Sequence, residues 1–161
     1  MIRKANIKDL SCIMEIYKSA QQFMAETGNP TQWGNFYPTL DLLEDDIAKG
    51  QLYVVERDGQ ICGVFVFFIG DDPWYEVIDH GDWLDDSPYG VIHRIAAKSG
   101  EKGIFVEAKQ FALSQIGHLR IDTHADNKIM QHIVTKHGFK ECGIIYVHEN
   151  KSPRIAYEYL E

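Results

Sequence analysis

Two lysines and two glycines lie together where an apolar segment gives way to an amphipathic helix: Lys98, Gly100, Lys102 and Gly103. Glycine lets the backbone approach a ligand closely, and the first turn of a helix directs unpaired N–H groups and the positive end of its dipole at the same point. This arrangement favours an anion, most commonly a phosphate or pyrophosphate. An ordinary tight connection between strand and helix would use the same residue types, so both interpretations stay open. A Walker A loop is excluded because no Gly-Lys-Ser/Thr follows.

Carboxylates are concentrated in a second segment, residues 71–89, which has seven acids and neither lysine nor arginine. The chain has a formal net charge of -8, and without this segment 17 acids stand against 16 bases. We expect no nucleic-acid partner, because a phosphate backbone favours a basic surface. Acids mixed with aromatic residues would attract a cationic, partly apolar amine. A solvated connection that its aromatic side chains anchor to the protein is the alternative.

The seven histidines and three cysteines lack the spacing of metal ligands. No His-x-x-x-His or Cys-x-x-Cys pair occurs, and the step of five residues from His132 to His137 places these side chains on different helix faces. We therefore predict no metal. The cysteines are odd in number and far from one another, which favours free thiols and a cytoplasmic location. No apolar run approaches the roughly 18 residues of a membrane span, so we expect no membrane association.

Hydrophobic periodicity predicts alternating strands and helices. Apolar residues recur every three or four positions from Ile7 to Met24, which is typical of a helix, and Asp58-Gly59 between two β-branched runs predicts a hairpin turn. We expect strands at 2–5, 52–56, 60–70, 89–97, 119–124, 141–147 and 154–160, and helices at 6–26, 39–50, 102–115 and 128–137. A strand–helix–strand unit makes 89–97 and 119–124 parallel neighbours. The prediction is one domain over residues 1–161, of the α+β class, with α/β/α layers around a mixed, mostly antiparallel sheet of about seven strands.

Two motifs, in this order, resemble the GCN5-related N-acetyltransferases (the GNAT family). Lys102-Gly103-Ile104 is similar to the central part of the family's Arg/Gln-x-x-Gly-x-Gly/Ala motif, and DNKIMQHIVTKHGF at 126–139 is similar to its Asn-led helix ending in Lys-x-Gly-Phe. The element order resembles the family over the whole chain. The sequence departs from the pattern at Gly100, which replaces an arginine or glutamine, and at Phe105, which replaces a small residue. It also has Val134 where many relatives have a tyrosine that protonates the leaving thiolate.

The resemblance implies acetyl-CoA as the co-substrate, held where the two parallel strands splay. Its pantetheine arm would pair with the backbone of Ile95, Ala96 and Ala97, although the two alanines are also compatible with tight packing against a helix. Its pyrophosphate would rest on the loop and helix start formed by Gly100, Lys102, Gly103 and Ile104. Asn127 would bind the pantetheine arm or, as its residue type also allows, cap the helix that follows it.

By the same resemblance, the protein would be an acetyl-CoA-dependent N-acetyltransferase, in which a primary amine of a small molecule or peptide attacks directly in a ternary complex. A noncatalytic acyl-CoA-binding or sensing domain is the alternative, because the glycine motif is altered and the tyrosine is missing. An alkyl amine has a pKa of about 10 and must lose a proton before it attacks, so a base is required. His93 is the leading candidate, since an imidazole is mostly neutral at pH 7, and a histidine satisfied within the sheet is the other interpretation. Glu76 is a second candidate base and Tyr146 a candidate proton donor.

Residues that bind the acceptor amine are expected in two places. Trp33 and Tyr37 follow the first helix, in the region that the family uses to line its acceptor pocket, and core packing would explain them too. Trp83 and Tyr89 belong to the acidic segment. Arg94 should point to the face opposite His93 if the strand alternates, where it would bind a substrate carboxylate or brace the acidic segment. A homodimer is compatible with the sequence.

Overall fold

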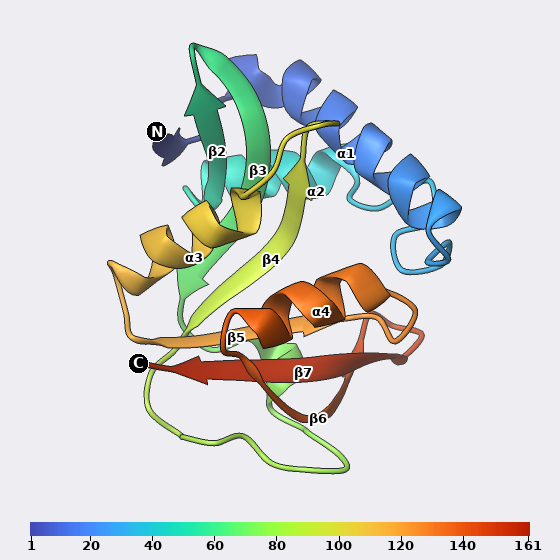
Figure 1. Ribbon diagram of the computed structural model, residues 1–161, viewed down its shortest axis with the longest axis vertical. Helices are drawn as coiled ribbons and strands as arrows, with labels where there is room; N and C mark the ends of the chain where they lie inside the picture. The colour runs from blue at the N-terminus through green and yellow to red at the C-terminus, as the bar shows by residue number, and fades with distance from the viewer.

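The computed structural model describes residues 1–161. Its seven strands form one sheet in the order β1-β2-β3-β4-β5-β7-β6 (Figure 1). The strands are β1 (Ile2–Lys4), β2 (Leu52–Arg57), β3 (Gln60–Ile69), β4 (Gly90–Ala97), β5 (His118–Thr123), β6 (Lys140–Val147) and β7 (Ser152–Leu160). The α-helices are α1 (Leu10–Glu26), α2 (Leu40–Ala48), α3 (Ile104–Leu113) and α4 (Lys128–Lys136). Only β4 and β5 are parallel, so the predicted mixed, mostly antiparallel sheet is confirmed.

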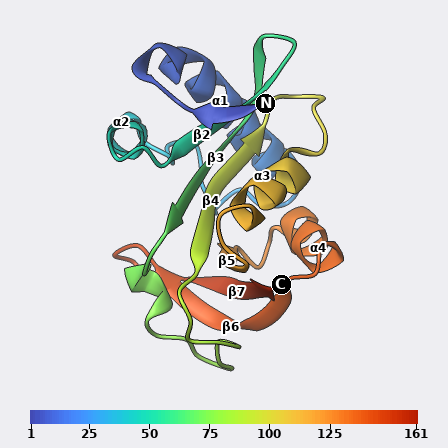
Figure 2. The ribbon, with the colours of Figure 1, turned by 90° about the vertical axis from the view of Figure 1, so that its left-hand side faces the viewer.

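Helices cover both faces of the sheet (Figure 2). On one face, α3 and α4 close a core that includes Ile104, Ala108 and Val134. On the other face, α1 and α2 pack through Ile13 and Leu43 against β2, β3 and β4. A third, smaller cluster forms where the 71–89 segment covers the far half of that face. The predicted three layers are therefore present, and none of the helices is both long and apolar enough to cross a lipid bilayer.

Local sequence explains most element ends, with a few shifts from the predicted bounds. Asn6 and Asp9 form a full capping box at a short 3-10 turn, Ile7–Asp9, which leads into α1. Asp58 and Gly59 both have positive φ, 52° and 76°, as the tight hairpin between β2 and β3 requires. The third helix begins at Ile104 and not at 102, because Gly103 has a φ of 81° and stands outside it. It ends at Leu113, β1 ends at Lys4, and β7 begins at Ser152.

Two irregularities in β4 shape the middle of the sheet. The strand pairs with β5 only at Gly90–Leu119 and Val91–Arg120, after which the two strands diverge (Figure 1). Its pairing with β3 is also interrupted, because the register shifts between Val64 and Val66 and Arg94 adopts a φ of 48°. This β-bulge bends the strand beside the point where the sheet opens.

Candidate functional site

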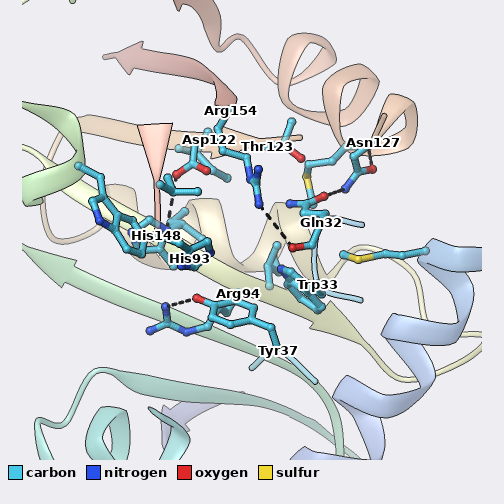
Figure 3. Close-up of a pocket in the computed structure, with 17 residues that line it drawn as sticks. Gln32, Trp33, Tyr37, His93, Arg94, Asp122, Thr123, Asn127, His148 and Arg154 are labelled. Carbon is cyan, nitrogen blue, oxygen red and sulfur yellow. Dashed lines mark hydrogen bonds and ion pairs between the residues drawn. The ribbon is translucent and has the colours of Figure 1, made fainter. Parts of the chain in front are cut away.

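Two hollows lie along the opening between β4 and β5. The central cavity, with a volume of about 70 Å³, is lined by β4, β5, β7, the end of α1 and the loop that follows it; the lining includes Gln32, Trp33, Tyr37, Trp74, His93, Arg94, Asp122, Thr123, His148 and Arg154 (Figure 3). The outer groove, of about 350 Å³, runs along Ile95–Ala97, the loop 98–101, α1 and α4. Met24, Ile95, Asn127 and Met130 line both, so the groove and the cavity adjoin each other.

The first turn of α3 presents the unpaired amides that the sequence predicts. The backbone N–H groups of residues 102–106 donate to no acceptor within the protein, and the first bond of the helix is donated by Glu107 to the Gly103 carbonyl. Arg57 holds the loop between β4 and α3 in place. Its guanidinium donates to Glu101 at 2.7 Å and to the Lys102 carbonyl at 2.9 Å, and it also pairs with Glu107 on α3. Amides in this arrangement can donate hydrogen bonds to an anion.

The residues expected to hold the pantetheine arm line the outer groove. Ile95, Ala96 and Ala97 all lie along it, and so does Gly100, which was expected to contact the pyrophosphate. From Ile92 onward, the edge of β4 that faces β5 has no strand partner, so its backbone groups are available to an extended ligand. Lys98 is exposed at the end of the groove.

Asn127 is a helix cap whose two side-chain polar atoms each make one hydrogen bond within the protein. Its Oδ1 accepts from the Met130 amide at 3.0 Å, and its Nδ2 donates to Gln32 Oε1 at 3.0 Å. The second bond connects the loop after α1 to α4 across the mouth of the central cavity (Figure 3). One N–H of Nδ2 and one lone pair of Oδ1 have no partner within the protein and could bind a ligand.

His93 lies at the wall of the central cavity between two carboxylates. Its Nε2 is 2.7 Å from Asp72 Oδ2, and its Nδ1 is 3.8 Å from Asp122 Oδ2. An Nε2–H that donates to Asp72 leaves Nδ1 with the lone pair of a base. Asp122 also accepts a hydrogen bond of 2.7 Å from the Tyr75 hydroxyl. The acidic segment thus supplies Asp72, the carboxylate that orients this histidine.

Burial and charge perturb the groups around His93. Burial acts to raise the pKa of Asp72, but the hydrogen bond and charge of His93, the Trp74 amide and the Arg94 charge together outweigh it, and the pKa lies below its ordinary value. Burial, with Asp122 nearby, raises the pKa of Tyr75 well above its ordinary value. The pKa of His148 is lowered, first by burial and then by the neighbouring Arg154 charge. The groups around His93 are therefore partly desolvated. Perturbed pKa values of this kind cluster at functional sites.

Arg94 does not follow the predicted alternation. The bulge at its positive φ turns its side chain so that it lines the same cavity as His93. Its guanidinium donates to both oxygens of the buried Asp46, at 2.9 and 2.8 Å, and to the Tyr37 hydroxyl at 3.2 Å. Arg94 therefore braces α2 and the loop after α1, and not the acidic segment.

The structure brings some of the other expected residues to the cavity and leaves others outside. Trp33 and Tyr37 line it, with ring centroids 6.4 Å apart. Trp83 and Tyr89 do not, because their rings pack on the Arg120 guanidinium, with ring centroids 4.1 and 4.0 Å from the Arg120 Cζ. Two candidate catalytic residues are also absent from both hollows: Glu76, which is exposed, and Tyr146, whose pKa is raised by the Asp79 carboxylate.

Several cavity residues were not singled out from the sequence, namely Gln32, Asp122, Thr123, His148 and Arg154. Asp122 and Arg154 lie within segments that were correctly predicted as strands. Asp122 is at a polar position of an alternating strand and Arg154 begins its predicted strand, so neither residue stands out from the pattern. Trp74, and not Trp83, is the tryptophan of the acidic segment that reaches the cavity. No group of three or more His, Cys, Asp or Glu side chains is arranged to hold a metal ion.

Neither a family model nor a curated protein matches the sequence, whereas many solved structures share its fold. An acetyltransferase of the GNAT family from Streptococcus agalactiae is 29% identical, with a TM-score of 0.87 over 100% of this chain and 95% of that chain. An acetyltransferase from Staphylococcus aureus is 28% identical, with a TM-score of 0.72 over 99% and 98%. The PaiA N-acetyltransferase from Thermoplasma acidophilum, in complex with coenzyme A, shares the fold at 17% identity, with a TM-score of 0.62 over 100% and 98%. The resemblance inferred from the motifs is therefore confirmed, and the chain has the fold of the GCN5-related N-acetyltransferase family along its whole length.

Proposed function

We propose that this protein is an acetyl-CoA-dependent N-acetyltransferase that acts on a primary amine in a ternary complex. The observation that carries the proposal is that the outer groove and the central cavity adjoin at Ile95 and Asn127. A donor in the groove and an acceptor in the cavity would meet beside the open edge of β4. The structural relatives that are acetyltransferases support the same activity.

Two features of the outer groove and the adjoining start of α3 suit coenzyme A. The free amides of residues 102–106 suit a pyrophosphate, and the unpaired edge of β4 suits the amide groups of a pantetheine arm. When bound, acetyl-CoA supplies the acetyl group as an activated thioester. Backbone N–H groups on the open edge of β4 would stabilise negative charge that develops on the acyl oxygen.

His93 is the base of the proposed mechanism. It lines the cavity where the acceptor would lie, and Asp72 holds its Nε2 so that Nδ1 can accept a proton from the amine, directly or through one water. Asp72 would then stabilise the imidazolium that forms, because its carboxylate stays ionised and close.

The proton that the leaving thiolate needs must come from a group other than residue 134. Val134, which belongs to α4, is fully buried in the core. Tyr37 is the tyrosine that lines the cavity, and Arg94 donates to its hydroxyl oxygen, which leaves the hydroxyl proton free to be donated. Tyr37 therefore replaces Tyr146 as our candidate donor.

An amine screen tests the proposal. Thiol release from acetyl-CoA should be detected with at least one member of a panel of amino acids, polyamines, aminoglycosides and peptide amino termini. His93→Ala should lower kcat about 100-fold or more with little change in coenzyme A affinity. His132→Ala, at an exposed position on α4, is the matched control. Coenzyme A binding without turnover across the panel would instead favour the sensing domain, and an unaffected kcat in His93→Ala would remove this residue from the mechanism.

Donor placement has its own test. Gly103→Glu puts a negative charge and a strained left-handed residue beside the free amides, and it should weaken coenzyme A binding at least about tenfold. Gly50→Glu is the matched control, since Gly50 also has a positive φ, 67°, and follows α2 on the opposite face of the sheet. Equal coenzyme A affinity in the two variants would reject the proposed phosphate site.

A further inference from the structure

The central cavity contains a buried cation without a counter-ion. Arg154, on β7, is 5% exposed, and no carboxylate oxygen lies within 4.0 Å of its guanidinium nitrogens. Its Nη1 donates to Ser152 Oγ at 2.6 Å and to the Pro153 carbonyl at 3.0 Å, while Nη2 reaches only the Gln32 carbonyl, at 3.4 Å. A buried charge normally pairs with an opposite charge, so this guanidinium has unused capacity for an anion.

The other charged groups of the cavity are already engaged. Arg94 is neutralised by both oxygens of Asp46, although its buried Nε has no hydrogen-bond partner. Asp122 accepts from the Tyr75 hydroxyl and faces His93, and it lies beyond ion-pair distance of Arg154. The carboxylates of the acidic segment do not line the cavity, which that segment reaches only through Trp74. Arg154 is therefore the cation there that lacks a partner.

An unpartnered hydroxyl lies on the neighbouring strand. Thr123 is 1% exposed, lines the same cavity, and its Oγ1 is buried without a hydrogen-bond partner. Its partner across the sheet is Ile155, so the Thr123 side chain lies on the face of the sheet opposite to that of Arg154, and both side chains reach the cavity where the sheet opens. Figure 3 shows Thr123 and Arg154 at one end of the cavity, with His93 farther along its wall. A guanidinium without a counter-ion and a hydroxyl without a hydrogen-bond partner therefore line the same cavity.

We propose that Arg154 and Thr123 form a subsite for a carboxylate, so that the acceptor is a small amine that carries a carboxylate group. A guanidinium can bind both oxygens of a carboxylate, and the threonine hydroxyl can donate to one of them. The cavity volume of about 70 Å³ favours an amino acid over a large acceptor. The identity of the acceptor rests on the proposed acetyltransferase function, whereas binding of the carboxylate can be measured without turnover.

Matched ligand pairs test the subsite. The common amino acids, and dipeptides with a free carboxyl end, are compared with their primary amides in calorimetric binding to the protein saturated with coenzyme A, and then in kcat/KM with acetyl-CoA. At least one carboxylate ligand should bind about 10- to 100-fold more tightly than its amide. A stronger effect for amino acids than for dipeptides would assign the carboxylate to a free amino acid, and the reverse to a peptide end. No preference for any carboxylate over its amide would overturn the proposal.

Variants separate ligand binding from a structural role. In Arg154→Met the preference for the carboxylate should disappear, mainly through KM, and Arg154→Lys should restore part of it, which a purely structural role would not do. Thr123→Val, which keeps the side-chain shape, should reduce the preference by a smaller factor. A preference that persists in Arg154→Met would overturn the subsite. Arg154-dependent binding without acetylation would support the subsite and contradict the acetyltransferase function. Acetylation at equal rates with and without a carboxylate on the amine would support the acetyltransferase function and contradict the subsite.

Discussion

Replacing Arg94 by methionine should destabilise the protein by about 3–5 kcal/mol, because it leaves the buried Asp46 carboxylate without its counter-ion. Asp46 is 3% exposed, and both of its oxygens accept hydrogen bonds from the Arg94 Nη2, at 2.9 and 2.8 Å. No other lysine, arginine or histidine lies within 4.0 Å of this carboxylate. Methionine keeps most of the length of the side chain, so the loss of charge and hydrogen bonds dominates the effect.

The expected loss is a large fraction of the total stability of a domain, which is about 5–15 kcal/mol. For a chain of this size, each kcal/mol corresponds to roughly 2–4 °C in Tm, so the midpoint should fall by about 6–20 °C. Urea denaturation followed by circular dichroism gives the free energy of unfolding, and a thermal scan gives Tm.

The pH dependence of the variant tests the cause. Burial raises the pKa of Asp46 above its ordinary value, and Arg94 opposes this shift. Without Arg94 the pKa should rise further. A group whose pKa is higher in the folded state stabilises the fold at low pH, and that stabilisation is lost as the pH rises through the folded-state pKa. Arg94→Met should therefore lose less stability at about pH 5 than at about pH 7, by up to about 1.4 kcal/mol for each pH unit.

A double variant supplies the decisive control. Arg94→Met combined with Asp46→Leu removes both charges and should recover most of the lost stability, since hydrophobic residues can replace a buried ion pair at little cost. A loss below about 1 kcal/mol in the single variant, or a loss that does not depend on pH, would refute the reasoning that the pair is held in a desolvated site.

Three further predictions concern other parts of the fold. Asp72→Asn should lower the free energy of unfolding near pH 7. The difference from the parent should shrink below about pH 4, because a carboxylate with a lowered pKa stabilises the fold only while it is ionised. Urea titrations that show the same difference at every pH would contradict this. Gly63→Val should lower Tm and coenzyme A affinity, since a Cβ at this position would lie 2.6 Å from Ile104 Cγ2 at the start of α3, and Ile104→Ala should relieve the effect. Asn6→Ala should cost about 1 kcal/mol in urea denaturation by removing the capping box before α1, and no change would mean that the cap is replaced by solvent.

The helices, strands and the donor loop were predictable from the sequence because their determinants are local. Periodicity places α1, a cap at Asn6 starts its first turn, and a positive-φ pair at Asp58-Gly59 closes the hairpin within a few residues of chain. The free amides at the start of α3 are local too, since unpaired N–H groups belong to the first turn of any helix. The shifts at element ends are small for the same reason.

The central cavity was decided by tertiary structure. His93 meets Asp72 and Asp122 through segments far apart in the chain, and Arg154 becomes a lone buried cation only when β7 pairs beside β5. The bulge that turns Arg94 toward the cavity comes from the register between β3 and β4, which no single segment encodes. Propensity, caps and turns are short-range interactions that a sequence displays directly, whereas burial, register and the pairing of charges depend on which distant segments pack together.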